Sequence, residues 1–443
     1  MEKSIAQPPE SFGRKLRLIG PGIILAAAAI GSGELILTPR AGALYGLSIA
    51  WIIAVSVVYK LALTLGLARY TIATGEDIFL GFSHIPGPRY WFVWVMSVVF
   101  LLGAVGYSGI SLACGSALSA LFPSLSMVQW AVIVVILAYI LLLGGSYGSV
   151  EKAAFVLSFV LIVGILYSLA VLQPNVSFFL RGLVPKLPAG AGQTAVSLLG
   201  WTAGGTSTLI YSFWIIEKGI GTNRGSDVPY GSIQGHSKAA KNFRVWLSMI
   251  YLDTGLSYLL MMVVSLAFLT IGVLVLRTAG PDGGPLIPSR EETAVVLSRL
   301  LTVAAGPQAK YIFLIAAFAI LYSTVIGLVD GKSRALRTAL RVIAPGSDRI
   351  SDVNVYRLFV TFMCLIIFAF LFTERPVVLI VLISALEAPV LSFSAILLIY
   401  LIHKRLPRAF RPGLLWHLVM GCGTVLYLVL SSIVLVRTMI GLI

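Results

Sequence analysis

The stretch that decides the fold runs from Gly20 to Gly46 and reads GPGIILAAAAIGSGELILTPRAGALYG. It is apolar and longer than the roughly 20 residues that a membrane-spanning helix needs. Its middle, Gly31–Glu34, nevertheless holds two glycines and a carboxylate. A glycine inside a helix costs about 1 kcal/mol against alanine, and a charge inside the membrane costs roughly 3 kcal/mol or more. The pattern predicts a helix interrupted at a midplane binding site; a kinked helix with a glycine packing face is the alternative.

The composition is that of a polytopic membrane protein. The 443 residues are 58% hydrophobic and 11% charged, whereas soluble domains carry about 25% charged residues. Cys114, Cys364 and Cys422 lie in apolar runs without a CxxC motif, so we expect neither a disulfide framework nor a zinc site. The sequence shows no Walker A motif and no nucleophile motif. We therefore expect no enzymatic activity and no cofactor, apart from a divalent cation as cargo.

Apolar runs predict about eleven spans. A polar, basic N-terminal segment over 1–17 is expected to be cytoplasmic and not a cleavable signal peptide, and residues 18–443 to form a single transporter domain. The expected parts of this domain are a first repeat at 18–173, a second repeat at 194–402 and an extra helix at 413–436. The predicted spans are 18–45, 48–70, 92–121, 127–145, 152–173, 194–217, 243–276, 309–331, 355–373, 377–402 and 413–436.

Lysines and arginines in the loops predict the orientation. The N-terminus is expected in the cytoplasm, and the odd span count then places the C-terminus outside. The net charge of +15 is therefore interpreted as a sign of the chain's orientation in the membrane, and we expect the protein in the inner cell membrane. The expected partners are the lipid bilayer and a small transported substrate or ion, without nucleic acid, and we expect a monomer. The bases assigned to the cytoplasmic face are Arg14, Lys15, Arg17, Arg69, Arg89, Lys218, Arg224, Lys238, Lys241, Arg244, Lys332, Arg334, Arg337, Arg341, Arg349, Lys404, Arg405, Arg408 and Arg411.

The sixth span repeats the anomaly of the first. Residues 197–214 read SLLGWTAGGTSTLIYSFW, with glycines at 200, 204 and 205 and a hydroxyl run at 206–208. The two interrupted helices lie five spans apart. In an inverted repeat of five plus five helices, the corresponding helices are interrupted together and face each other across the binding site.

Few ionisable residues lie inside the predicted spans, and such residues are functional candidates by default. Glu34 is the strongest candidate because it shares an interrupted helix with free backbone carbonyls, and Glu387 follows. Asp330, beside basic residues at 332 and 334, is interpreted as part of an interfacial ion pair. Asp253 is either a structural hydrogen-bond partner or a pathway residue.

The residues around the two interruptions offer oxygen ligands. Hard divalent cations favour carboxylate, hydroxyl and carbonyl oxygens, and no Met, His or Cys lies near either interruption. Alternatively, amides at a half-helix N-terminus attract a substrate carboxylate, and Glu34 pairs with an amine. The predicted substrate-binding residues are Ala28, Gly31, Ser32, Glu34, Trp201, Gly204, Thr206 and Glu387, with Glu34 as the metal ligand.

The first two spans resemble the NRAMP family of divalent-metal transporters. The resemblance is carried by Gly20-Pro21-Gly22, by RAGALYG at 40–46 and by LTLGLARYTIATGED at 63–77, which is similar to the family's LG-x-(V/A)-TGKDL stretch. Weaker similarity continues as far as Gly331. The resemblance implies an all-α membrane protein with a LeuT-type fold. This fold has two inverted five-helix repeats, an eleventh helix, and interruptions in helices 1 and 6.

The family's metal site does not carry over intact. Its DPGN motif falls on Gly31–Glu34, its MPH motif on Gly204–Thr206, and its third-helix acids, tied to proton movement, on Gly109 and Leu112. We therefore expect a secondary transporter that moves a hard divalent cation, magnesium- or manganese-like, by alternating access without a clear proton relay. Two alternatives stay open. One is a transporter of an amino acid or other small zwitterion, since Ile30–Gly33 is similar to the IGSG of amino-acid permeases; the other is a non-transporting substrate sensor.

Overall fold

The computed structural model describes residues 7–8, 31, 33–145, 148–174, 182–221, 238–280, 282–288 and 291–440. Over these residues the chain is helical and contains no strand. Nine helices of this part are long and apolar enough to cross a membrane, which agrees with the prediction of a polytopic all-α protein. The predicted segment over 1–17, apart from 7–8, lies outside the described residues, as do the predicted site residues Ala28 and Ser32.

The helices follow the predicted spans with shifts at their ends. The described part of the first predicted span, which starts at Gly33, continues into the second as one helical run to Thr74, with a positive φ of 67° at Gly46. The sixth span is divided into three pieces. The elements are η1 (Gly33–Leu37), α3 (Thr38–Tyr45), η2 (Gly46–Ile49), α4 (Ala50–Thr74), α5 (Ile78–Phe82), α6 (Trp91–Leu121), α7 (Met127–Gly144), α8 (Gly148–Leu172), α10 (Gly192–Trp201), η3 (Thr202–Ile210), α11 (Tyr211–Glu217), α12 (Lys238–Ile271), η5 (Gly272–Leu276), α13 (Thr293–Ala305), α14 (Ala309–Ile343), η6 (Pro345–Arg349), α15 (Asp352–Leu371), α16 (Pro376–Arg405), η7 (Arg408–Phe410) and α17 (Leu414–Met439).

Local sequence explains where several helices begin and end. Ser126 and Gln129 form a capping box at the start of α7, in which each side chain bonds the other residue's backbone N–H. Asp77 accepts a hydrogen bond from the N–H of Leu80 at 3.0 Å and so caps α5. At the other end, Gly75 adopts a left-handed conformation (φ 69°) and closes α4, which glycine does without steric cost.

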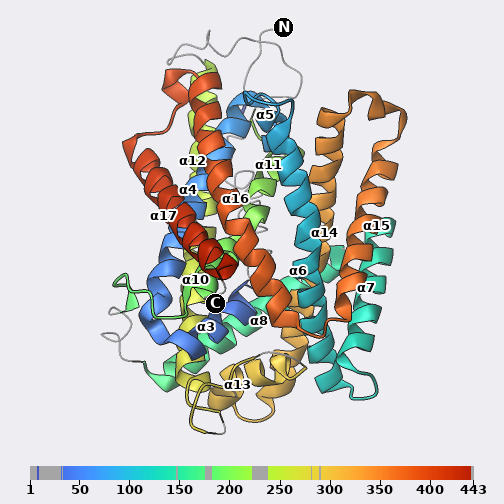
Figure 1. Cartoon of the computed structure of the whole chain (residues 1–443). Helices are drawn as coiled ribbons and strands as arrows, with labels where there is room; N and C mark the ends of the chain where they lie inside the picture. Colours follow the sequence, from blue (N-terminus) through green and yellow to red (C-terminus); the bar gives the residue numbers. More distant parts are fainter. Residues whose placement is uncertain are drawn as a thin grey trace.

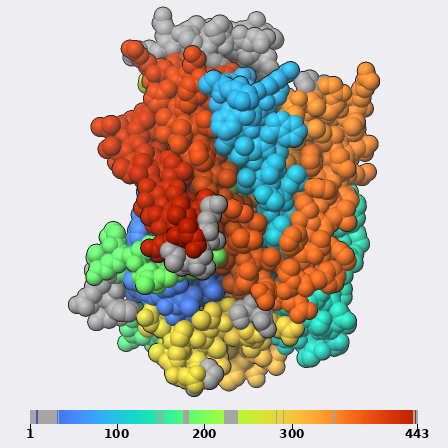
Figure 2. All heavy atoms as spheres, viewed as in Figure 1, coloured from blue at the N-terminus to red at the C-terminus, as the bar shows by residue number. Residues whose placement is uncertain are grey.

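The divided sixth helix passes through the middle of the bundle (Figure 1). α10 packs against α16, and η3 packs against α4, α14 and α16. α6 packs against α14 and α16, with α7 and α15 along one flank of the molecule. α17 covers α16 and α4 on the other flank and forms part of the outer surface (Figure 2). The interruptions are therefore enclosed by helices and not exposed to lipid.

The structure differs from the prediction in two places. α14 continues to Ile343, well past the predicted end at residue 331. The sequence that follows, KSRALRTALRVI, contains strong helix formers and no proline or glycine before Pro345. Lys332 therefore lies inside a helix and is buried, not on the cytoplasmic face. The predicted outer loop between Arg277 and Lys310 also contains a short apolar helix, α13.

Gly200 marks the closest approach of α10 to α16. A Cβ at this position would lie 1.7 Å from the carbonyl oxygen of Ser384, so Gly200→Ala forces the helices apart. We expect a loss of about 1–3 kcal/mol of stability or more, as for other overpacked sites, measured as a lower thermal unfolding midpoint. Gly255→Ala in α12 is the control, because no atom lies within 4 Å of its added Cβ, and it should not lower the midpoint. Equal midpoints for the two variants would contradict the close packing.

Candidate functional site

The two interrupted segments meet in the middle of the molecule. Within η3, Ala203, Gly204 and Gly205 have φ values of 58°, 99° and 54°, so the helix stops and restarts here, as the sequence predicts. Opposite it, Gly33 begins the π-helical turn η1, and a Cβ on Gly33 would lie 3.0 Å from the carbonyl oxygen of Trp201. A glycine at 33 therefore favours the close approach of the two backbones, because any other residue would push the Trp201 carbonyl back by a few tenths of an ångström.

Glu34 joins the first interrupted segment to the second. Its side chain is fully buried. The Oε1 atom accepts hydrogen bonds from the N–H of Ala203 at 2.9 Å and from the hydroxyl of Ser265, on α12, at 3.3 Å. The Oε2 atom has no hydrogen-bond partner among the described residues. An unpartnered buried carboxylate oxygen is costly, so this atom is a candidate ligand atom.

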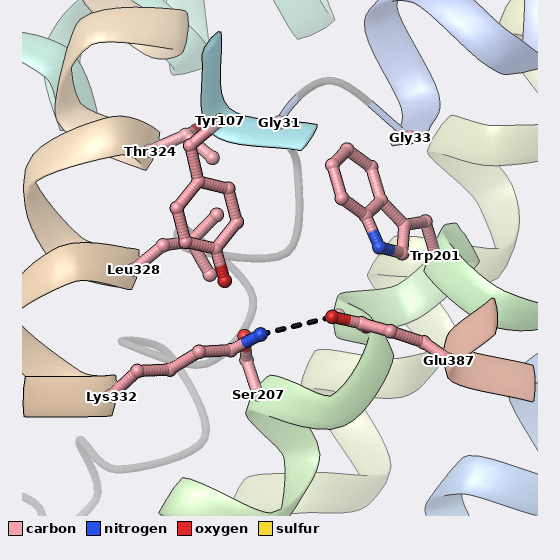
Figure 3. A pocket seen from close by; sticks show the side chains of 10 residues that line it. Gly31, Gly33, Tyr107, Trp201, Ser207, Thr324, Leu328, Lys332 and Glu387 are labelled. Carbon is pink, nitrogen blue, oxygen red and sulfur yellow. Dashed lines mark hydrogen bonds and ion pairs between the residues drawn. The ribbon is translucent and has the colours of Figure 1, made fainter. Parts of the chain in front are cut away.

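Glu387, on α16, binds the restart of the second helix. Its Oε2 atom accepts a hydrogen bond from the N–H of Thr206 at 2.9 Å, and its Oε1 atom accepts one from the ammonium of Lys332 at 2.9 Å. Both side chains are buried, and they point toward each other across the cavity (Figure 3). Both carboxylate oxygens of Glu387 are thus occupied by groups of the protein.

The Lys332 ammonium also faces two aromatic rings. Its Nζ atom lies 4.8 Å from the ring centroid of Phe100 and 5.2 Å from that of Tyr107, distances at which a cation–π attraction contributes. The distribution of basic residues predicts Lys332 in a cytoplasmic segment. Two features of the sequence indicate that Lys332 is buried. The residues that follow it favour a helix, and it lies two residues from Asp330, so the two side chains point to different faces of that helix.

Lys60 is a second buried lysine at the site and was not among the residues predicted from the sequence. Lys60 lies in α4 and is fully buried. Its Nζ atom donates to the carbonyl of Gly200 at 2.9 Å and to the carbonyl of Thr202. A lysine at the centre of a predicted span is a functional candidate, as Glu34 is, because this holds for an intramembrane charge of either sign.

A cavity of about 30 Å³ lies between the interruptions, with room for one or two water molecules. Four predicted site residues line it: Gly31, Trp201, Gly204 and Glu387. Glu34 and Thr206 are buried beside it and are not part of its lining. The other lining residues are Gly33, Tyr107, Ser207, Thr324, Leu328 and Lys332, and Figure 3 shows the Trp201 and Tyr107 rings above the ion pair.

A second cavity, of about 620 Å³, adjoins the first. The two share Ser207, Thr324 and Leu328 in their linings, and the larger one extends between α8, α11 and α14. Charged residues stand along it, among them Lys152 and Arg334. The two cavities thus lie next to each other, separated by the shared residues Ser207, Thr324 and Leu328.

Asp330 forms the ion pair that the sequence predicts, but with one of the two suggested bases. The Nε atom of Arg334 lies 2.9 Å from Oδ2 of Asp330, and the Tyr356 hydroxyl donates to Oδ1 at 2.6 Å. Lys332 pairs with Glu387 instead. Asp253 is buried in α12 and lines neither of the two cavities, which favours its structural interpretation.

The donor set near the interruptions consists of oxygens. Over the described ranges, no three His, Cys, Asp or Glu side chains come together as a metal-binding group. The buried Oγ1 atoms of Thr202 and Thr206 have no hydrogen-bond partner among the described residues, as is the case for Oε2 of Glu34. One carboxylate with hydroxyls and carbonyls suits a hard cation that keeps part of its water shell.

Comparisons with known proteins agree with this architecture. A protein of Pasteurella multocida (strain Pm70), itself uncharacterized, is 24% identical over 351 residues, which are 77% of this chain and 75% of that protein. The divalent metal cation transporter MntH of Yersinia pestis (strain Pestoides F) is 30% identical over 196 residues, so the chain spans about half of it (46%), with 42% of this chain aligned.

Solved structures share the fold at low sequence identity. A mutant of the manganese transporter of Eremococcus coleocola superposes with a TM-score of 0.64 at 16% identity, covering 97% of this chain and 89% of that one. Mhp1 in its inward-facing conformation gives 0.59 at 13% identity, over 90% and 80% of the two chains. The predicted LeuT-type fold is confirmed. The family model described as "Natural resistance-associated macrophage protein-like" matches residues 22–437, and the chain therefore belongs to the NRAMP family.

Proposed function

We propose that this protein is a secondary transporter that moves a hard divalent cation, manganese- or magnesium-like, across the membrane by alternating access. The observation that carries the proposal is Oε2 of Glu34, a buried carboxylate oxygen that has no hydrogen-bond partner among the described residues and lies beside the interruption of the sixth helix. Family membership supports cation transport, and relatives that match part of the chain are named as divalent metal cation transporters.

The ligand set explains why a hard cation is proposed rather than a soft transition metal. Carboxylate, hydroxyl and carbonyl oxygens bind magnesium and manganese well, whereas thioether and imidazole select softer ions. The positions where the resemblance places the family's sulfur and imidazole ligands are Gly204–Thr206. Proton movement through the family's third-helix acids is not part of the proposal, because Gly109 and Leu112 stand at those positions and carry no titratable group.

The larger cavity supports an access path to this site. It adjoins the small cavity at Ser207, Thr324 and Leu328. With the orientation that the loop charges predict, its charged rim, including Arg334, faces the cytoplasm. We infer that this conformation is open toward the cytoplasmic side and that the small cavity is the substrate site in a contracted form.

A second candidate substrate is a small organic zwitterion or carboxylate, and Lys332 favours it. Its ammonium lines the small cavity together with Trp201 and Tyr107, a combination that suits an organic molecule with a negative group. Two buried lysines, Lys60 and Lys332, also balance the charges of Glu34 and Glu387. A divalent cation would bring two further positive charges into this neutral cluster, which a low-dielectric interior disfavours.

A ligand panel separates these substrates. Purified protein in detergent is heated with Mg²⁺, Mn²⁺ or Ca²⁺ chloride, or with a set of amino acids and small carboxylates. Divalent transport predicts that Mg²⁺ or Mn²⁺ raises the unfolding midpoint with a concentration dependence, since a ligand that binds the native state stabilises it. A response to organic ligands alone would exclude the divalent cation. Stabilisation by a ligand with no flux into sealed liposomes would indicate a sensor instead.

A further inference from the structure

The ammonium of Lys60 lies at the end of α10, where the helix is interrupted. The last carbonyls of a helix have no partner within the helix, and this end carries a partial negative charge. Lys60 supplies the missing donor by bonding the carbonyls of Gly200 and Thr202. Ser56, one turn earlier on the same face of α4, also donates to the Thr202 carbonyl, at 3.5 Å.

The other groups around Lys60 are negative or electron-rich. Glu34 and Glu387 both attract it electrostatically. Glu34 accepts the N–H of Ala203, the residue directly after Thr202, so the carboxylate stands at the same turn of backbone as the carbonyls. Exposed carbonyls beside a carboxylate, at the end of a half-helix, are the surroundings in which transporters of this architecture hold a monovalent cation.

A purely structural lysine would be placed differently. Long basic side chains inside a membrane protein direct their charge toward water when they can. Lys60 instead lies in the middle of α4, is fully buried, and directs its charge at backbone carbonyls that the interruption has freed. The buried charge thus lies where the interruption has left backbone carbonyls without helical partners.

We propose that the Lys60 ammonium is a tethered cation that permanently fills a monovalent-cation site formed by the carbonyls of Gly200 and Thr202. The protein consequently needs no bound sodium or other alkali cation to keep the interrupted helix folded. Removing the side chain leaves an empty oxygen-lined site, which a small free cation can enter. This inference does not depend on the identity of the transported substrate.

The test is a salt-dependent thermal unfolding experiment on the purified full-length protein. Wild type, Lys60→Ala, Lys60→Met and the control Lys152→Ala are heated in sodium, lithium, ammonium or choline chloride at equal concentration. Wild type and Lys152→Ala, whose lysine is exposed, are expected to unfold at the same temperature in all four salts. Lys60→Ala is expected to unfold several degrees lower in choline, and to recover part of that loss in at least one of the three small cations.

Lys60→Met separates lost charge from lost volume. Its side chain refills the space without a charge, so the variant is expected to stay destabilised in every salt. The proposal is overturned if Lys60→Met is as stable as wild type, if the loss in Lys60→Ala is the same in all four salts, or if wild type itself is selectively stabilised by sodium or lithium. Should Lys60→Ala not fold, Lys60→Met and the salt response of wild type decide the question. No transported substrate is present, so the result stands apart from the cation-transport proposal.

Discussion

Glu34→Gln is expected to lower the uptake of the divalent cation into sealed liposomes by at least about tenfold. The glutamine keeps the size of the side chain and one oxygen that can accept the N–H of Ala203, so the helices stay joined. It replaces the free Oε2 atom by an amide NH₂, which cannot ligate a cation, and it removes the negative charge that attracts one. Loss of a charged ligand from a buried site exceeds 1.4 kcal/mol, which is a factor of about ten in affinity, and we expect flux to fall by at least that factor.

The measurement is initial uptake in sealed liposomes, together with the thermal unfolding midpoint to show that the variant folds. Glu374→Gln is the control, because Glu374 lies exposed in the turn between α15 and α16, away from both cavities, and its uptake should equal wild type. Wild-type flux by folded Glu34→Gln would remove Glu34 from the substrate site. The same loss in the control would show that the assay responds to something other than the site.

Lys332→Met unfolds at a much lower temperature than wild type. The substitution leaves Glu387 as an unpaired charge in the protein interior, and breaking one partner of a buried ion pair costs about 3–5 kcal/mol. Glu387→Gln is expected to be damaging for the same reason, because it strands the Lys332 ammonium beside Phe100 and Tyr107. The double variant removes both charges together and should regain much of the lost stability.

A double-mutant cycle on the thermal unfolding midpoint measures this coupling. Neighbours in one network are non-additive by about 0.5–3 kcal/mol, whereas additive losses in the double variant would contradict a direct Lys332–Glu387 pair. Ligand-induced stabilisation of Lys332→Met adds information on the substrate. A carboxylate substrate loses its cationic partner and no longer stabilises the variant, while a divalent cation that binds through Glu34 still does.

The fold could be predicted from the sequence to a large extent. Helices that cross a membrane need long apolar runs, and such runs leave an unambiguous pattern in composition and length. The glycines at 31, 33, 204 and 205 marked both interruptions, because glycine is costly inside a helix unless the backbone requires it. Boundaries were less accurate. α14 continues beyond residue 331 because helix propensity, and not hydropathy, determines where a helix ends once it leaves the apolar layer.

The candidate site could be predicted only in part. Glu34 and Glu387 were recognised as isolated acids in apolar surroundings. In the structure both bond to the interrupted sixth helix, Glu34 from η1 to Ala203 and Glu387 from α16 to Thr206. Their roles as substrate ligands stay predictions. Lys332 was wrongly predicted on the cytoplasmic face. The positive-inside rule counts basic residues by their position in the sequence and does not show which way a side chain points.

The sequence by itself determined that Gly204–Thr206 lies at an interruption of a membrane-spanning helix, and it predicts the same for Gly31–Glu34. The reason is that the cost of a glycine or a charge inside a helix depends on the residue and its neighbours in the chain. Only the tertiary structure decided what those interruptions bind within the protein. Lys60 reaches the carbonyls of Gly200 and Thr202 from a helix some 140 residues away in sequence, and Lys332 neutralises Glu387 from another. A charge's partner depends on distance and direction in space, which one chain's residue order does not contain.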